Sequence, residues 1–158
     1  MHNIKILGID PALHNVGWCI VSPSKMQGKV LYIDSGLIAT NPTDAIEKRL
    51  SDIHQGLCNI ISQYVPEKAV IEETFVNKNN ASSLKLAYGR AACLLSCSIN
   101  NVRIINITAK QVKKSLTGNG NADKNQVAYM VRLILGSSFQ SKNHNITDAA
   151  AIALTHAL

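Results

Sequence analysis

The sequence predicts an α/β fold, with a mixed five-stranded sheet covered by helices on both faces. Three apolar segments within residues 4–40, separated by Gly, Pro and Ser, resemble antiparallel strands. After them, helical patterns alternate with two further short apolar segments, as in α/β proteins. The 158 residues are close to the usual size of one domain and contain no repeat or linker. We therefore expect residues 1–158 to form a single domain.

The elements follow from apolar runs and turn residues. The predicted strands are IKILGID (4–10), VGWCIVS (16–22), VLYIDSGLIAT (30–40), KAVIEET (68–74) and VRIINIT (102–108). Apolar residues recur at helical spacing over 46–60, after NPTD, which is expected to supply cap and first-turn residues. Within that helix, Ile53 and Leu57 are predicted to be core. Further helices are predicted over residues 84–95, 109–116, 123–135 and 147–158.

Several protein classes do not fit the composition. No apolar run approaches the ~20 residues of a membrane span, and the N-terminus lacks the pattern of a secretory signal. We therefore expect a soluble cytoplasmic protein. The cysteines form no CxxC pair, and no histidine stands at zinc-finger spacing from them. Cys93 and Cys97, four apart on a predicted helix, are interpreted as buried hydrophobes in preference to a metal or redox pair.

Charge is distributed unevenly along the chain. The net charge is +6, but residues 1–74 carry 6 basic and 8 acidic side chains, whereas residues 75–158 carry 10 basic and 2 acidic ones. Because a solvated surface usually mixes its signs, this excess favours a polyanionic partner, nucleic acid above all, over a general contribution to solubility.

Three acidic residues are candidates for a shared metal site. Asp10 and Glu72 each follow an apolar strand, and Asp148 is placed in the first turn of the last helix, after Thr147 as N-cap. Each has a purely structural alternative: a turn residue, a surface charge and a favourable first-turn acid. Gathered together, they would repel one another unless a divalent cation joined them, and Mg²⁺ suits a few carboxylates with water and phosphate oxygens. Two such ions can drive phosphodiester hydrolysis.

Five linked blocks of the chain resemble the RuvC Holliday-junction resolvases. They are ILGIDP, VIEETF, NKNNASSLKLAYGRA, AKQVKKSLTGNGNADKNQVAYMV and TDAAAIALTHAL. The resemblance covers nearly the whole chain and implies a ribonuclease-H-like fold, a homodimer and two Mg²⁺ per subunit, for which Mn²⁺ can substitute. It also implies paired symmetric nicking of four-way DNA junctions in homologous recombination and DNA repair, together with the RuvA–RuvB branch-migration complex.

The resemblance also assigns the metal ligands. They fall on Asp10, Glu72, Asp148 and a fourth position, Asn145, where many members have Asp and some have His. Asn145 offers a carbonyl oxygen without charge and should hold a cation less firmly than Asp would. The neighbouring His144 is a possible substitute. Ala12, where the family usually has Gly, is a second departure and concerns only the turn geometry.

Six residues are expected to meet DNA. The resemblance places a base-stacking aromatic at Phe75, worth ~1–3 kcal/mol per base, although an apolar aromatic at such a position is usually part of the core. It places Lys113 and Lys124 near the scissile phosphate as catalytic residues, the alternative being ordinary solvated charge. Backbone contacts are expected from Lys78, Lys85 and Arg90.

One loop and one helix each have two interpretations. The loop TGNGNA (117–122) could let its backbone approach phosphate or could simply connect two helices. The helix bearing Leu84, Tyr88, Ala91 and Leu95 could form the dimer interface or pack in the core.

Two different functions also fit part of the sequence. An actin-like ATPase or sugar kinase likewise begins with a strand, an acid and a turn, but it needs a second domain for the nucleotide, for which 158 residues leave no room. A junction-binding protein with a site weakened at Asn145 is the non-enzymatic possibility. A nicking assay on a four-way junction distinguishes both from a nuclease.

Overall fold

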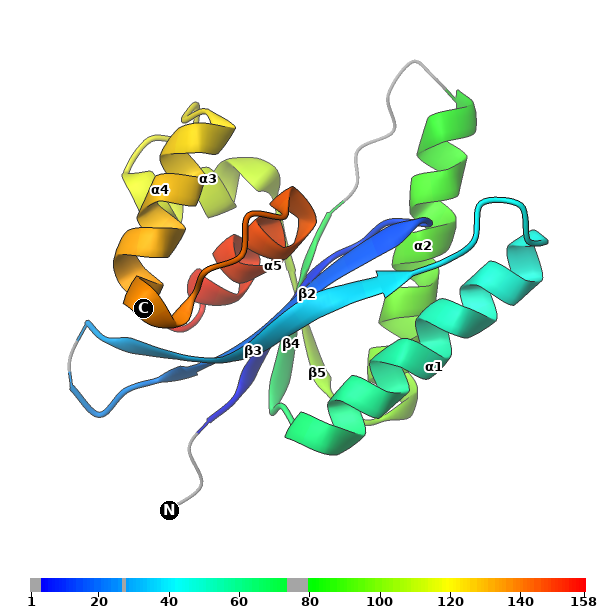
Figure 1. Cartoon of the computed structure of the whole chain (residues 1–158), viewed down its shortest axis with the longest axis horizontal. Coiled ribbons are helices and arrows are strands. Elements are labelled where there is room, and N and C mark those ends of the chain that lie inside the picture. The colour runs from blue at the N-terminus through cyan, green and yellow to red at the C-terminus, as the bar shows by residue number, and fades with distance from the viewer. Residues whose placement is uncertain (1–3, 27, 74–79) are drawn as a thin grey trace.

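The protein is built on the predicted five-stranded mixed sheet, in the order β3-β2-β1-β4-β5 (Figure 1). The computed structural model describes residues 4–26, 28–73 and 80–158. The strands are β1 (Ile6–Asp10), β2 (Asn15–Pro23), β3 (Val30–Ala39), β4 (Lys68–Glu72) and β5 (Arg103–Ile107). The first three strands pair antiparallel, and β4 and β5 extend the sheet in parallel from β1. The strand predictions are therefore confirmed to within a few residues at their ends.

The parallel pairing of β1 and β4 decides where the acids lie. Their ladder runs from the Ile6–Lys68 pair to the Ile9–Ile71 pair. Asp10 and Glu72 follow immediately after this last pair, so both end their strands at the same edge of the sheet. The sheet thus brings together two residues that are 62 positions apart in the chain.

Helices cover both faces of the sheet, as predicted. Figure 1 shows α1 (Ile46–Tyr64) and α2 (Asn80–Ile99) on one face. The other face carries α3 (Ala109–Thr117), α4 (Lys124–Leu135) and α5 (His144–Leu154), with a 3₁₀ turn at Gly136–Ser138. No helix among the described residues is both long and apolar enough to cross a membrane.

Each face of the sheet has its own apolar core. Ile53 and Leu57 are fully buried in the core under α1 and α2, which confirms their prediction. Cys93 and Cys97 lie in the same core as fully buried thiols, which confirms their interpretation as small hydrophobes. The second core packs α3, α4 and α5 against the opposite face. The strand ends that carry Asp10 and Glu72 therefore belong to a sheet that is packed on both faces.

Two helix starts differ from the prediction. The first helix begins after Ala45, which makes no side-chain capping bond, so NPTD does not supply the cap. The last helix begins one turn early, because the Asn143 side chain accepts hydrogen bonds from the backbone N–H groups of Asn145 and Ile146. Thr147 is consequently a buried residue inside α5, where its hydroxyl donates to the Asn143 carbonyl. Asp148 therefore lies in the second turn, not the first, and the helix ends at Leu154.

Candidate active site

The six residues expected to act in catalysis all line one cavity of about 330 Å³. Its polar lining consists of Asp10, Glu72, Lys113, Lys124, Asn145 and Asp148. We call this the acid cavity. It lies at the edge of the sheet where β1 and β4 end, between that edge and helices α3, α4 and α5. Five separate elements contribute to it, so only the folded chain can form it.

Helix α5 is held against the sheet by a close backbone approach. Gly17 of β2 pairs with Asp10 of β1, and it is buried. A Cβ atom added to Gly17 would lie 2.1 Å from the carbonyl oxygen of Asn145. Because only glycine leaves room for this contact, the first turn of α5 can lie directly over the end of β1. That contact sets Asn145, and Asp148 one turn later, beside Asp10.

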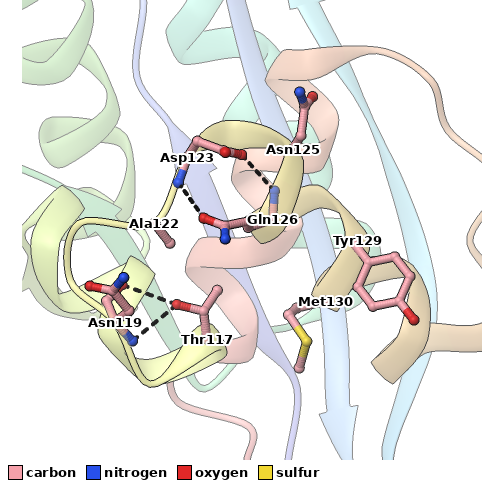
Figure 2. A pocket seen from close by; sticks show the side chains of 8 residues that line it. All are labelled: Thr117, Asn119, Ala122, Asp123, Asn125, Gln126, Tyr129 and Met130. Carbon is pink, nitrogen blue, oxygen red and sulfur yellow. Dashed lines mark hydrogen bonds between the residues drawn. The ribbon is translucent and has the colours of Figure 1, made fainter.

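The two lysines are placed by well-capped helices. Thr108 and Gln111 form a reciprocal capping box at the start of α3, the helix that carries Lys113. Asp123 and Gln126 form a second one at the start of α4, directly before Lys124 (Figure 2). Such boxes satisfy otherwise unpaired N–H groups and fix the helix start. The backbone from which Lys124 projects is therefore firmly defined, although its side chain is 80% exposed.

The turn between α3 and α4 satisfies its polar groups internally. The Thr117 hydroxyl accepts a hydrogen bond from the Asn119 backbone N–H and donates toward the Lys113 carbonyl. Figure 2 shows these groups around a cavity of about 500 Å³, which shares no lining residue with the acid cavity. These bonds fit the interpretation of loop 117–122 as a helix connection.

The acids of the cavity disturb one another. Burial, and then the charges of Asp148 and Glu72, raise the pKa of Asp10 to about 7. Burial followed by the Asp148 charge also raises the pKa of Glu72, against the lowering effect of the two lysines. Burial raises the pKa of Asp148, while Lys124 and His144 oppose this. Without a bound cation, the nearby lysines therefore do not fully balance the negative charge of the three carboxylates.

The donor set fits a hard divalent cation. Carboxylate and amide oxygens converge on the cavity, and partial burial with mutual repulsion is a strain that a cation would relieve. Within residues 4–26, 28–73 and 80–158, no three His, Cys, Asp or Glu side chains lie close enough together to hold a metal ion by themselves. Mg²⁺ typically takes only one or two protein carboxylates and completes its coordination with waters and substrate phosphate oxygens.

Of the four other predicted DNA contacts, two can be placed in the structure, and neither lines the acid cavity. Phe75 and Lys78 fall outside the described residues. Lys85 is exposed on α2 and lines a separate groove with Leu13 and Ile46. Arg90 is half-buried, and its guanidinium donates to the Glu72 backbone carbonyl and to the Asn106 side chain.

Sequence reasoning missed the apolar part of the cavity. Its remaining lining residues are Ala109, Val112, Val127 and Ala151. Three of them could have been found by helical spacing: Ala109 lies one turn before Lys113, while Val127 and Ala151 lie one turn after Lys124 and Asp148. The Arg90–Glu72 contact has no comparable signal, because it joins a side chain to a backbone oxygen of a distant strand.

Comparisons with known proteins identify the family of this chain. Residues 6–156 match the family model described as crossover junction endodeoxyribonuclease RuvC. A protein of that name from Rickettsia massiliae is 44% identical over 150 residues, which cover 95% of this chain and 94% of that one. The namesake from Ehrlichia canis is 40% identical, covering 98% of this chain and 96% of its own.

Solved structures agree with the sequence matches. Thermus thermophilus RuvC in complex with a Holliday junction substrate superposes with a TM-score of 0.90 at 31% identity, covering 98% of this chain and 93% of the other. The yeast mitochondrial Holliday junction resolvase, at 15% identity, shares the fold with a TM-score of 0.68 over 97% of this chain and 78% of its own. The ribonuclease-H-like fold implied by the sequence resemblance is confirmed by these matches.

Proposed function

The chain belongs to the RuvC family of crossover junction endodeoxyribonucleases, and on this premise we propose that it resolves four-way DNA junctions by paired symmetric nicks. The family is one of metal-dependent nucleases acting in recombination and repair. The observation that carries the proposal is the convergence of Asp10, Glu72, Asn145 and Asp148 with two lysines on one cavity. That arrangement fits phosphodiester hydrolysis.

The acids and Asn145 are the proposed ligands of two Mg²⁺ ions, with Mn²⁺ as a substitute. Bound Mg²⁺ would supply an activated water and stabilisation of the leaving oxygen. Two strand ends and one helix hold these four residues around the site. Asn145 supplies a neutral oxygen where an acid would supply charge, so the affinity for metal should be lower than with Asp at this position.

Lys113 and Lys124 are proposed to stabilise the negative charge that develops on the phosphate. Lys113 is half-buried and Lys124 is exposed at the mouth of the cavity. A preorganised positive charge near a reacting phosphate acts mainly on the transition state. We expect both lysines to contribute more to the rate of cleavage than to junction affinity.

Beyond the two lysines of the acid cavity, Phe75, Lys78 and Lys85 are the proposed contacts to DNA, and we call this set the DNA track. Support comes from the excess of basic residues after position 74 and from the exposed position of Lys85. Phosphate contacts supply affinity and salt dependence, whereas preference for a junction depends on DNA shape. We leave Arg90 out of this set because its guanidinium is engaged within the protein.

A second copy of the chain is the proposed partner of helix α2. Leu84, Tyr88, Leu95 and Ile99 are 53%, 40%, 57% and 59% exposed, at the spacing of one helical face. We call these four residues the α2 stripe. Cys93 and Cys97 of α2 are fully buried in the core and lie away from this stripe. Core packing therefore does not account for the stripe, and two-fold symmetry would place two equivalent sites on one junction.

Two further expectations rest on family membership alone. We propose that the protein acts together with the RuvA–RuvB complex and that it works in the cytoplasm, where its DNA substrate is found. Neither proposal is tied to a particular surface of the molecule.

The decisive experiment compares the chain as it stands with Asn145→Asp and Asp10→Asn. Each protein is incubated with a labelled four-way junction in Mg²⁺ or Mn²⁺, and both binding and nicking are measured. We expect all three to bind, the first two to cut with Asn145→Asp faster, and Asp10→Asn not to cut. A linear duplex of the same sequence is the substrate control.

Three contrary outcomes can be distinguished. If neither the unaltered chain nor Asn145→Asp cuts while both bind the junction, the protein is a junction-binding module and the metal proposal fails. If only Asn145→Asp cuts, the chain as it stands is a weakened nuclease. Undiminished cutting by Asp10→Asn would remove Asp10 from the site.

A further inference from the structure

Helix α2 is fastened to the strand end that carries Glu72. The Arg90 Nε atom donates a hydrogen bond of 3.1 Å to the Glu72 backbone carbonyl, and its Nη2 atom donates one of 2.6 Å to Asn106 Oδ1 on β5. Glu72 lies one residue beyond the last pair of the β1–β4 ladder. Arg90 therefore holds the backbone at a point that β1 no longer supports.

The residue before Arg90 touches the other strand end. Gly89 is buried, and a Cβ atom added to it would lie 2.2 Å from the carbonyl oxygen of Ala12. Ala12 follows Asp10 by two residues. Successive residues of α2 thus contact the chain just after Asp10 and the backbone of Glu72 itself, which ties both acid-bearing strand ends to one rigid helix.

From these contacts we propose that Arg90 is a positioning residue, which keeps the Glu72 carboxylate at its proper place relative to Asp10. The inference deepens the proposed function and rests on it. A guanidinium suits this task because its planar fork can donate to two acceptors at fixed angles, whereas a lysine ammonium cannot span them in the same way. Groups that support metal ligands from behind typically change metal affinity or activity 10–100-fold when removed.

Arg90→Met and Lys85→Met form a matched pair for the test. Both remove one positive charge from α2, but Lys85 is exposed whereas Arg90 contacts Glu72. We expect Arg90→Met to weaken Mn²⁺ binding by the DNA-free protein about 10-fold, measured calorimetrically. Its single-turnover nicking at saturating junction should fall by a similar factor and recover partly at high metal concentration. Its junction affinity should stay within about 3-fold of wild type.

Lys85→Met should show the opposite pattern. We expect weaker junction binding and a smaller dependence of that binding on salt, with unchanged Mn²⁺ affinity. Arg90→Lys keeps the charge but not the fork, and it should resemble Arg90→Met in metal binding. It also covers the case in which Arg90→Met does not fold.

The inference is overturned if the Arg90 variants lose junction affinity as Lys85→Met does while they retain wild-type Mn²⁺ affinity.

Hydrogen exchange provides a readout that needs neither metal nor cleavage. The Glu73 backbone N–H donates to the Ile107 carbonyl, and its exchange should accelerate in the Arg90 variants but not in Lys85→Met. Unchanged exchange would also overturn the inference. If wild type neither binds metal nor nicks, the proposed function fails, and the exchange experiment still decides the role of Arg90.

Discussion

The ammonium nitrogen of Lys124 lies 3.9 Å from a carboxylate oxygen of Asp148 at the mouth of the acid cavity. This is a weak, solvent-screened contact, because the Lys124 side chain is 80% exposed. Its charge nevertheless lowers the pKa of all three acids, Asp10, Glu72 and Asp148, against the raising effects of burial and mutual repulsion. Lys124 is thus a partial counter-charge for the cluster and a donor available to a phosphate.

Replacing Lys124 by Met should therefore slow nicking and move its pH dependence. Without the ammonium group, the pKa of each acid rises, so a higher pH is needed before the ligands are ionised. We expect a rate loss of about 10- to 100-fold and an upward displacement of the acidic limb of the pH–rate profile. Single-turnover assays from pH 6 to 9 measure both effects. Lys114→Met, on the exposed side of α3, serves as the control.

Replacing Asp10 by Asn should stabilise the metal-free protein while abolishing cleavage. The pKa of Asp10 is about 7 in the folded state against an ordinary value of 3.8. Ionised Asp10 therefore destabilises the fold, and this cost grows as the pH rises from about 4 to about 7 and is complete above that. At pH 8 the variant should be more stable by on the order of 2 kcal/mol, with the difference vanishing near pH 4.

Chemical denaturation with and without Mg²⁺ checks this prediction. Added Mg²⁺ should stabilise the wild type more than the variant, because a ligand stabilises the state that binds it. Glu67→Gln, at an exposed position just before β4, controls for the loss of one negative charge. A variant that is less stable than the wild type in metal-free buffer at pH 8 would contradict the raised pKa of Asp10.

Much of this site could be predicted from the sequence, for local reasons. An apolar run that ends in an acid marks a strand end, and parallel neighbours bring such ends to one edge. Asp10 and Glu72 follow this logic directly. The family resemblance, together with the predicted last helix, places Asp148 beside them. The predicted start of that helix is nevertheless wrong. Thr147 and Asn143 are both capping residues, and only the packing of α5 selects Asn143.

Contacts between a side chain and a distant backbone could not be predicted. Arg90 carries the positive charge expected of a DNA contact, but its guanidinium donates to the Glu72 backbone carbonyl. Only the charge is visible in the sequence. Gly17 and Gly89 likewise show no pattern along the chain, because the reason for each is a backbone atom of another element. The helical spacing of the α2 stripe is visible in the sequence. Whether the stripe faces solvent or the core is not, because that depends on how α2 packs against α1 and the sheet.

Gly17→Ala should disable the site without removing the DNA track. The added Cβ would lie 2.1 Å from the Asn145 carbonyl, and since this is backbone the first turn of α5 must shift. We expect a loss of about 1–3 kcal/mol of stability and a drop in nicking of more than 10-fold, with junction affinity retained. Gel-shift and nicking assays on the folded variant test this.

Gly36→Ala is the matched control for Gly17→Ala. Gly36 lies on β3 opposite Trp18, and its added Cβ would lie 2.9 Å from the Trp18 ring, away from the acid cavity. Strain at Gly36 should lower stability but leave the rate per folded molecule unchanged. Equal loss of nicking in both variants would show that Gly17 acts through general stability and not through Asn145.

Leu95→Glu should convert the protein to a monomer. Leu95 is 57% exposed and adjoins an apolar groove of about 340 Å³ that is also lined by Tyr88 and His54. A carboxylate here would be buried against the partner's stripe without compensation, at a cost large enough to separate the subunits. Leu133→Glu, on the exposed side of α4 and 63% exposed in the wild type, is the control for an added surface charge. Sedimentation should give a dimer for the wild type and for Leu133→Glu, and a monomer for Leu95→Glu.

The monomer should also change the products of cleavage. Each subunit keeps a complete acid cavity, so a monomeric variant is expected to retain single nicks while the second, symmetric nick loses its coordination with the first. On a supercoiled plasmid that extrudes a cruciform, the wild type should release linear product, whereas Leu95→Glu should accumulate nicked circles. A Leu95→Glu protein that remains dimeric and still releases linear product would place the subunit interface elsewhere than on the α2 stripe.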